Sequence, residues 1–179
     1  MRKIFRPLIP LLLASTISTV YAQTDLRLAI DLVKAARFDF AFLTGAQLAL
    51  QRDAEEGKAP KDKSDCFSQQ KPSELTEPMA AYLASQLTDQ ELKTALSFYL
   101  SPLGRKYTQY GIVSFYKNYR FETVDQLPAF SNQEMAEIAA FSKTAVGDKL
   151  FYKQLVRSSI KSEPLARVWT KLRRACGLQ

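Results

Sequence analysis

The sequence predicts an all-α fold, a single-domain bundle of about seven helices that contains two repeated helix–corner–helix units. Apolar residues recur at the three- and four-residue spacing of a helix along most of the chain, and the alternation typical of a strand is almost absent. One segment occurs twice, with helix-start signals in both copies. With 179 residues, of which 46% are hydrophobic, the chain is long enough to bury one ordinary core.

Residues 1–22 have the pattern of a secretory signal peptide. Basic residues precede a short apolar run, and small or compact residues end it, so we expect cleavage after Ala22. Pro10 and several hydroxyl residues interrupt the run, whereas a membrane span needs about 20 apolar residues. No cysteine follows the cleavage site for lipid attachment. We therefore expect residues 23–179 to form one periplasmic domain without a transmembrane segment.

The charge of the mature chain argues against nucleic acid as a partner. Arg2, Lys3 and Arg6 leave with the signal, which lowers Lys plus Arg from 25 to 22 against 18 Asp plus Glu, a net charge of +4. Nucleic-acid-binding proteins usually concentrate more positive charge on one face, and an exported protein seldom meets nucleic acid. We expect a protein partner in the cell envelope instead.

The chain has two cysteines, Cys66 and Cys176. In an oxidising compartment an even number of cysteines favours a disulfide, which would join the middle of the chain to its C-terminal helix. A bridge closing so long a loop stabilises by about 4–5 kcal/mol in the chain-entropy model. The sequence alone leaves open whether the bridge forms within one chain or between two. A redox role is disfavoured because the chain lacks a Cys-x-x-Cys motif.

Three helices are predicted before the repeated segment. Apolar spacing favours helices at about 25–36 and 39–55, separated by a corner. Lys, Asp, Gly and Pro are frequent in residues 56–73, which we interpret as the one long loop. A third helix is expected to be capped near Thr76. Pro78 would then lie in its first turn, where proline is tolerated.

The internal repeat is the most informative feature of the sequence. "LTDQELKTALSFYLSPLGRKY", which begins at Leu87, aligns without gaps to "FSNQEMAEIAAFSKTAVGDKL", which begins at Phe130. We interpret the repeat as two copies of one supersecondary unit, at about 87–120 and 130–160. Five pairs of residues are identical: Gln90 and Gln133, Glu91 and Glu134, Phe98 and Phe141, Gly104 and Gly147, and Lys106 and Lys149.

Each copy is predicted to begin with a capped helix. Thr88 with Glu91, and Ser131 with Glu134, fit the capping box, in which the hydroxyl and the carboxylate each accept from a backbone N–H at the helix start. The carboxylates therefore have a structural explanation that needs no catalytic role.

The corner between the two helices of each copy is predicted from a second cap. Ser101-Pro102 is a cap followed by proline at the first helical position, and Thr144 serves the same purpose in the second copy. Glycine then follows at Gly104 and Gly147, where we expect a close approach of the preceding helix. The second helices are predicted to continue to about Tyr119 and Ile160, and a last helix to span Ser162 to Cys176.

The paired segments resemble an exported bacterial family catalogued as domain of unknown function number 2059. Members of that family are similar in having a signal peptide, an all-helical body and a helix followed by an aromatic residue and Ser-Pro-x-Gly-x-Lys. The resemblance covers roughly Leu75 to Gln154 and is closer in the first copy, since Thr144-Ala145 replaces Ser-Pro in the second. It implies a helical fold and an exported protein, and it implies no particular activity.

The sequence disfavours catalysis. It contains no histidine, which removes the commonest general base and transition-metal ligand. Ser114 with Lys117, and Ser158 with Lys161, have the Ser-x-x-Lys spacing of penicillin-recognising enzymes but lack the companion motifs. A pair of carboxylates could still hydrolyse envelope sugars. The candidates for that pair are Glu74, Glu77, Glu91 and Glu134.

Two groups of basic residues are candidates for interaction. Lys106 and Lys149 recur in both copies, and nothing in the corner itself requires a base there. Near the C-terminus, basic residues are expected on one helix face, where they would be solvated or would bind an acidic protein or anionic lipid headgroups. That face would carry Arg167, Lys171 and Arg174, opposite Val168, Leu172 and Ala175.

These observations favour a non-catalytic periplasmic protein that acts by binding another protein or an envelope component. One alternative is an immunity protein or inhibitor that neutralises a toxin or hydrolase delivered into the periplasm. Another is a carboxylate-dependent envelope hydrolase, which we consider the weaker hypothesis. We expect no catalytic residues, no cofactor and no metal site. The sequence does not indicate an oligomeric state, and a weak contact with a membrane surface is compatible with its basic C-terminal region.

Overall fold

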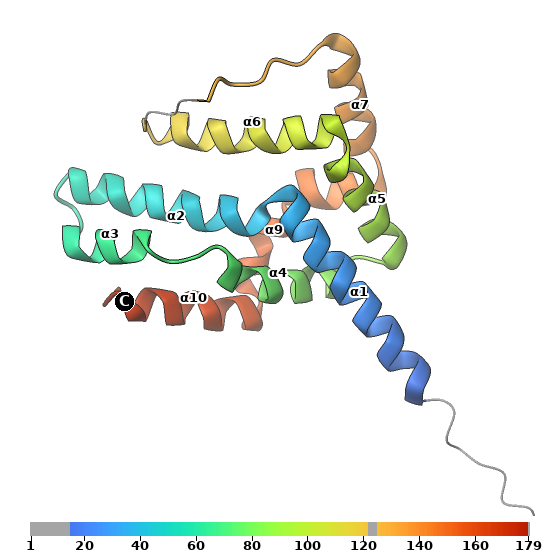
Figure 1. Cartoon of the computed structure of the whole chain (residues 1–179), viewed down its shortest axis with the longest axis horizontal. Coiled ribbons are helices and arrows are strands. Elements are labelled where there is room, and N and C mark those ends of the chain that lie inside the picture. Colours follow the sequence, from blue (N-terminus) through green and yellow to red (C-terminus); the bar gives the residue numbers. More distant parts are fainter. Residues whose placement is uncertain (1–14, 122–124, 179) are drawn as a thin grey trace, which may run out of the picture.

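The computed structural model describes residues 15–121 and 125–178, with side chains from Asp25 onward, and every regular element in this part of the chain is helical (Figure 1). The prediction of an all-α fold is therefore confirmed. None of the helices in the described residues is long and apolar enough to cross a membrane. Most of the predicted signal peptide lies outside the described residues, and Ala22 falls in the part of the first helix whose side chains are not described.

The described residues form ten α-helices rather than about seven. The first six are α1 (Ser15–Ala36), α2 (Phe38–Glu55), α3 (Lys61–Ser68), α4 (Ser73–Gln86), α5 (Asp89–Leu100) and α6 (Pro102–Asn118). The remaining four are α7 (Asn132–Ser142), α8 (Ala145–Gly147), α9 (Leu155–Ser158) and α10 (Glu163–Ala175). Two further helical segments are the π-helix η1 (Asp148–Tyr152) and the 3-10 helix η2 (Ser159–Lys161).

The predicted long loop at 56–73 is wrong in part, because it contains α3. Pro60 precedes this helix in an extended conformation, and buried Ser64 and Phe67 turn its inner side toward the rest of the molecule. The side chain of Gln47 on α2 donates to three backbone carbonyls at the end of α3 and just after it, at 3.1–3.3 Å. Tertiary contacts thus order a segment whose composition is typical of a loop.

The predicted cap at Thr76 is also wrong. The helix α4 begins three residues earlier, at Ser73, so Thr76 lies inside its first turns. The Thr76 hydroxyl donates instead to the carboxylate of Asp39, near the start of α2, and both side chains are buried. Asp39 also accepts from the backbone N–H of Phe40 at 2.8 Å. The threonine therefore joins two helices, and Pro78 is accommodated within α4.

The core lies where α1 packs against α4 and α5 (Figure 1). Ala29, Leu32 and Val33 on α1 have no exposed surface, and neither do Leu83 on α4 and Leu92 on α5. Burial of each large aliphatic side chain is worth about 1.5–3 kcal/mol. These three helices therefore form the centre on which the other elements pack.

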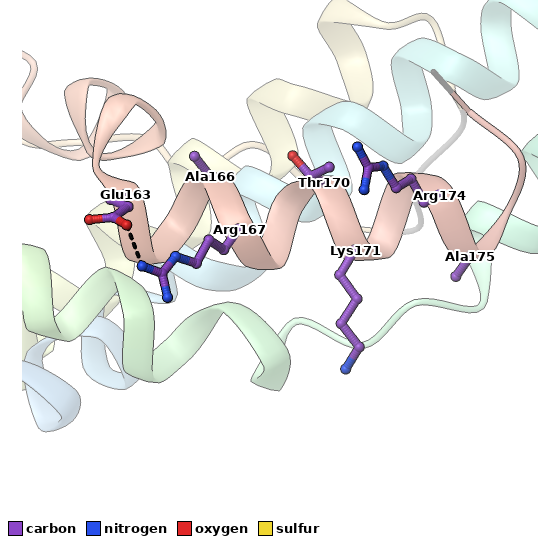
Figure 2. A pocket seen from close by; sticks show the side chains of 7 residues that line it. All are labelled: Glu163, Ala166, Arg167, Thr170, Lys171, Arg174 and Ala175. Atoms are coloured by element: carbon purple, nitrogen blue, oxygen red, sulfur yellow. Dashed lines mark hydrogen bonds and ion pairs between the residues drawn. The ribbon is translucent and has the colours of Figure 1, made fainter.

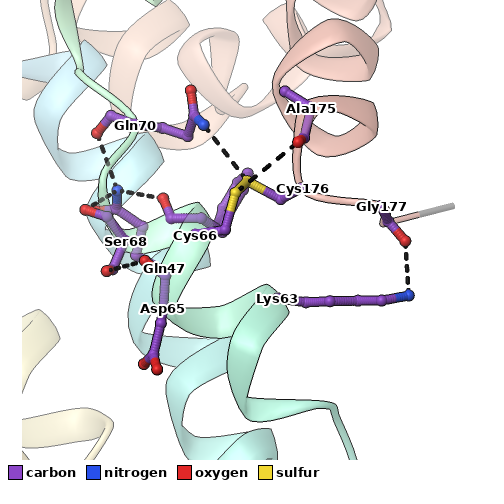
Figure 3. The surroundings of a disulfide bond; sticks show 10 residues. Gln47, Lys63, Asp65, Cys66, Ser68, Gln70, Ala175, Cys176 and Gly177 are labelled. Carbon is purple, nitrogen blue, oxygen red and sulfur yellow. Dashed lines mark hydrogen bonds between the residues drawn. A yellow bond between two sulfur atoms is a disulfide. The ribbon is translucent and has the colours of Figure 1, made fainter.

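A disulfide and an aromatic cluster hold the C-terminal helix at one end of the molecule. Cys66 of α3 is bonded to Cys176, the residue that ends α10, with their Cα atoms 5.6 Å apart (Figure 3). The Lys63 ammonium donates to the carbonyl of Gly177 at 2.7 Å. Trp169 of α10 contacts Phe42 and Phe67 edge to face, with ring centroids 5.2 and 5.7 Å apart. The predicted disulfide between Cys66 and Cys176 is thus present, and it forms within one chain.

The second copy of the repeat does not contain the long second helix that was predicted to reach Ile160. The helix α8 passes into η1, and Gln154 then adopts a left-handed backbone with φ of 50°. This conformation cannot continue a helix. It changes the direction of the chain so that Leu155 and Ser159 become buried.

Candidate functional site

The corner between α5 and α6 is built around one backbone carbonyl. The hydroxyl of Ser101 accepts from the backbone N–H of Gly104 at 2.9 Å and donates to the carbonyl of Phe98 at 2.6 Å. A Cβ added at Gly104 would lie only 1.9 Å from that carbonyl oxygen. Glycine is therefore required here by a close approach of the preceding helix, as the sequence predicted. Pro102 starts α6 at the position where its missing N–H costs nothing.

The corner between α7 and α8 repeats this geometry. The hydroxyl of Thr144 accepts from the N–H of Gly147 at 3.0 Å and donates to the carbonyl of Phe141 at 2.7 Å. A Cβ at Gly147 would lie 2.0 Å from the Phe141 oxygen. The rings of Phe98 and Phe141 stack with centroids 3.9 Å apart and planes 2° from parallel. The two corners thus lie against each other.

Each capping glutamate is paired with the lysine of the other copy. Glu134 completes the capping box of α7 with Ser131, and both of its oxygens accept from the Lys106 ammonium at 2.7 and 2.8 Å. Glu91 completes the capping box of α5, and it accepts from the Lys149 ammonium at 2.8 Å. The two ion pairs cross between the copies, so they tie α6 to α7 and η1 to α5.

These contacts keep both glutamates ionised. Partial burial alone would raise the pKa of Glu91, but the Lys149 ammonium and the backbone N–H of Thr88 stabilise the carboxylate, and the net pKa is lowered. For Glu134, the hydrogen bonds from Lys106 and from the N–H of Ser131 lower the pKa below its ordinary value of 4.5. A general acid needs a raised pKa, so neither carboxyl group has the property expected of an acid catalyst.

Lys106 and Lys149 therefore have structural partners that the sequence analysis did not assign to them. From the sequence, Glu91 and Glu134 are interpreted as helix caps or as members of a hydrolytic pair, and neither is assigned a lysine partner. A signal for the pairing was present, because the glutamate and the lysine both recur in the two copies. Neither lysine is free to contribute to a basic binding surface, since each is already neutralised by a carboxylate.

The outer face of α10 brings the predicted residues Arg167, Lys171 and Arg174 together on one exposed surface. An open groove of about 810 Å³ follows this face (Figure 2). Leu165 and Leu172 on the opposite side are buried in the core, which fixes the orientation of the helix. The groove is lined by Glu163, Ala166, Arg167, Thr170, Lys171, Arg174 and Ala175. Ala175 was predicted on the apolar side and is instead exposed on the groove.

The three basic residues of this face differ in their internal partners. Arg167 forms an ion pair with Glu163 one turn earlier, and both side chains are 75% exposed. Lys171 lies 4.0 Å from the carboxylate of Glu74 on α4 and is 78% exposed. Arg174 makes no ion pair with a described residue. Because exposed pairs contribute only about 0–1 kcal/mol, all three groups are available to an incoming anion.

The carboxylates considered for hydrolysis are not gathered into one site. Glu91 and Glu134 are held as described above, whereas Glu74 and Glu77 lie on α4 beside another groove, of about 510 Å³, which Lys34 also lines. No group of three or more potential metal ligands occurs among residues 25–121 and 125–178. Glu74 and Glu77 thus share a groove that neither Glu91 nor Glu134 lines.

The fold and these surfaces define a helical protein with one disulfide. The corners at Gly104 and Gly147 pack together, and the basic helix α10 lies at the C-terminal end of the chain. Residues 73–116 match the family model described as "Uncharacterized protein conserved in bacteria (DUF2059)". The match spans α4, α5 and nearly all of α6, so it includes the first glycine corner and confirms the resemblance there. Neither a curated protein nor a solved structure matches the chain.

Proposed function

We propose that this protein is a non-catalytic binding protein of the bacterial periplasm that docks an acidic protein surface on the outer face of α10. The observation that carries the proposal is the row of Arg167, Lys171 and Arg174 along one open groove. The disulfide at Cys176 and the buried aromatic contacts of Trp169 hold this helix in place, so little ordering is needed when a partner binds.

An acidic protein surface fits this face better than a lipid bilayer does. A helix that inserts into a membrane interface needs large apolar side chains beside its basic ones. The large apolar residues of α10, among them Leu165, Val168 and Leu172, are buried or half-buried against the core. Arginine is favoured at protein interfaces because its planar group binds carboxylates through two hydrogen bonds.

We also propose that residues 87–120 and 130–160 are two copies of one unit that pack face to face as a scaffold. The matched caps, the matched glycines and the crossed ion pairs support this interpretation. The scaffold would position the remaining helices, and α10 among them, without taking part in binding.

The α10 proposal is tested by reversing its charge. In the triple variant Arg167→Glu, Lys171→Glu, Arg174→Glu, binding of poly-L-glutamate, a stand-in for an acidic protein surface, should weaken at least about tenfold by titration calorimetry. The matched control reverses three exposed basic residues on other elements, Arg27, Lys117 and Arg157, and should bind like the wild type. Equal loss in both variants would show that net charge alone drives binding and would overturn the site.

Vesicles and crosslinking distinguish the other outcomes. Binding of the wild type to phosphatidylglycerol vesicles, with none to poly-L-glutamate, would replace the protein partner with a lipid surface. In periplasmic extract, a crosslinked protein that is captured by the wild type and by the control variant, and is lost from the α10 variant, would supply the partner for identification.

A further inference from the structure

The equivalent faces of α5 and α7 are buried to very different extents. On α5, Leu92 has no exposed surface, and α1 packs against this helix. The residue in the same place on α7 is Met135, which is 53% exposed. Ala139, the counterpart of Leu96, is exposed as well. The second copy therefore has the inner stripe of the first without the helix that covers it.

The apolar surface of α7 also extends beyond that inner stripe. Lys93 and Ser97 face solvent on α5, as polar residues normally do. Their counterparts on α7 are Ala136 and Ala140, which are both exposed. The α7 face, defined as Met135, Ala136, Ala139 and Ala140, is thus apolar even where the equivalent surface of α5 is polar. Figure 1 shows α7 at the edge of the molecule, away from α1.

We propose that the α7 face binds the α7 face of a second copy of this chain, in an antiparallel pair of helices. In the first copy of the repeat, a helix covers the equivalent surface, so a helix is the expected occupant. Alanine side chains allow two helices to approach closely. The same patch on both subunits can close the contact by two-fold symmetry, which is the commonest arrangement of homodimers.

The side chains at the two ends of α7 are complementary in the antiparallel orientation. Tyr152 is 68% exposed, and its hydroxyl lies 3.5 Å from the Ser142 hydroxyl at the C-terminal end of the helix. Pairing centred on Ala139 places Met135 of one copy opposite Ser142 and Tyr152 of the other, where a thioether–ring contact is favourable. The antiparallel orientation also aligns the two helix dipoles favourably.

Sedimentation velocity of the mature, disulfide-bonded protein over a concentration series tests this proposal. The wild type should form a dimer, and Met135→Glu should raise its dissociation constant by about tenfold or more. Leu100→Glu is the matched control, because Leu100 is 51% exposed but lies on α5 away from the α7 face, so it should dimerise like the wild type. A wild type that stays monomeric throughout, or equal losses in the two variants, would overturn the proposal.

A single introduced cysteine identifies the contacting surface directly. Cys66 and Cys176 are bonded to each other, so Ala140→Cys supplies the one reactive thiol. A short bis-maleimide should then join two chains in a band that resists reduction. Ser97→Cys, at the equivalent exposed position of α5, should give no such band. Crosslinking of Ser97→Cys but not of Ala140→Cys would place the dimer interface elsewhere and refute the α7 face.

Discussion

At the scale of single residues, the two corners are determined by a contact that leaves no room for a side chain. Phe98 and Phe141 each present a carbonyl oxygen to the glycine six residues later, and a serine or threonine hydroxyl holds that carbonyl from the other side. The hydroxyl both caps the second helix and binds the end of the first. One short side chain thus fixes the angle between two helices.

Replacing Gly104 with alanine should therefore destabilise the protein by about 2–4 kcal/mol, because the added Cβ would meet backbone atoms that cannot move aside cheaply. Gly147→Ala should cost about as much. Urea unfolding followed by circular dichroism measures both changes. Gly111→Ala is the control, since its added Cβ would meet nothing within 4 Å beyond the adjacent backbone of its own helix, and it should stabilise α6 by about 0.5–1 kcal/mol. A silent Gly104→Ala would contradict the close approach.

The Lys106–Glu134 pair predicts a dependence of stability on pH. The folded-state pKa of Glu134 is lowered, so its contribution is complete above the ordinary value of 4.5 and is lost as the pH falls through the lowered folded value. The stability difference between the wild type and Lys106→Met should be largest at neutral pH and should shrink in acid. Melting temperatures measured across this range check the prediction.

An exposed lysine provides the comparison for that experiment. Lys117 is exposed near the end of α6, and Lys117→Met should change the melting temperature by an amount that varies little with pH. A Lys106→Met effect that stayed constant down to acid pH would mean that other contacts of Lys106, such as its ammonium over the Phe130 ring, matter more than its ion pair with Glu134.

How far these residues could be predicted depends on the range of their interactions. The capping boxes and the serine corner were predicted correctly, because their partners lie three residues apart. The glycine contact was predicted from the repeat, since two glycines in one place indicate a geometric need. The crossed pairs of Lys106 and Lys149 were missed, because pairing across 28 and 58 residues depends on how the two copies pack.

At the scale of helices, the predictions failed where tertiary contacts decided the structure. The helix α3 has few apolar residues, and its order comes from Gln47, from the disulfide and from burial of Phe67. The segment after Gly147 has helical apolar spacing, yet the turn at Gln154 interrupts it so that Leu155 reaches the core. By contrast, α10 was predicted well because its basic and apolar faces are strongly separated in the sequence.

The same reasoning explains why the α7 face could not be predicted. The repeat indicated that α5 and α7 are equivalent helices, with Leu92 and Met135 in the same place. Only the path of α1 shows that one of these positions is covered and the other is exposed. A repeat in the sequence therefore predicts shared local geometry, whereas the surroundings of each copy follow from the rest of the chain.

At the scale of the whole molecule, two regions share one core. The crossed ion pairs and the Phe98–Phe141 stack lie on one side of the bundle, and the cluster of α2, α3 and α10 with the disulfide lies on the other. The helix α1 contacts both regions, and α4 packs against α2 and α10 while its Gln86 carbonyl accepts from Lys149. This continuity predicts that residues 23–179 unfold as one cooperative unit.

Trp169 makes that prediction measurable, because it is the one tryptophan of the chain and lies in the disulfide-linked cluster. In the wild type, urea transitions followed by Trp169 fluorescence and by helical circular dichroism should coincide. In the double variant Cys66→Ser, Cys176→Ser, both transitions should move together to lower urea concentration. The free energy of unfolding should fall by up to about 4–5 kcal/mol, because the unfolded chain is no longer cross-linked. Helix content before unfolding should be unchanged. If the fluorescence transition instead preceded the loss of helix, α10 and its neighbours would form a separate, weaker unit that the disulfide stabilises from within.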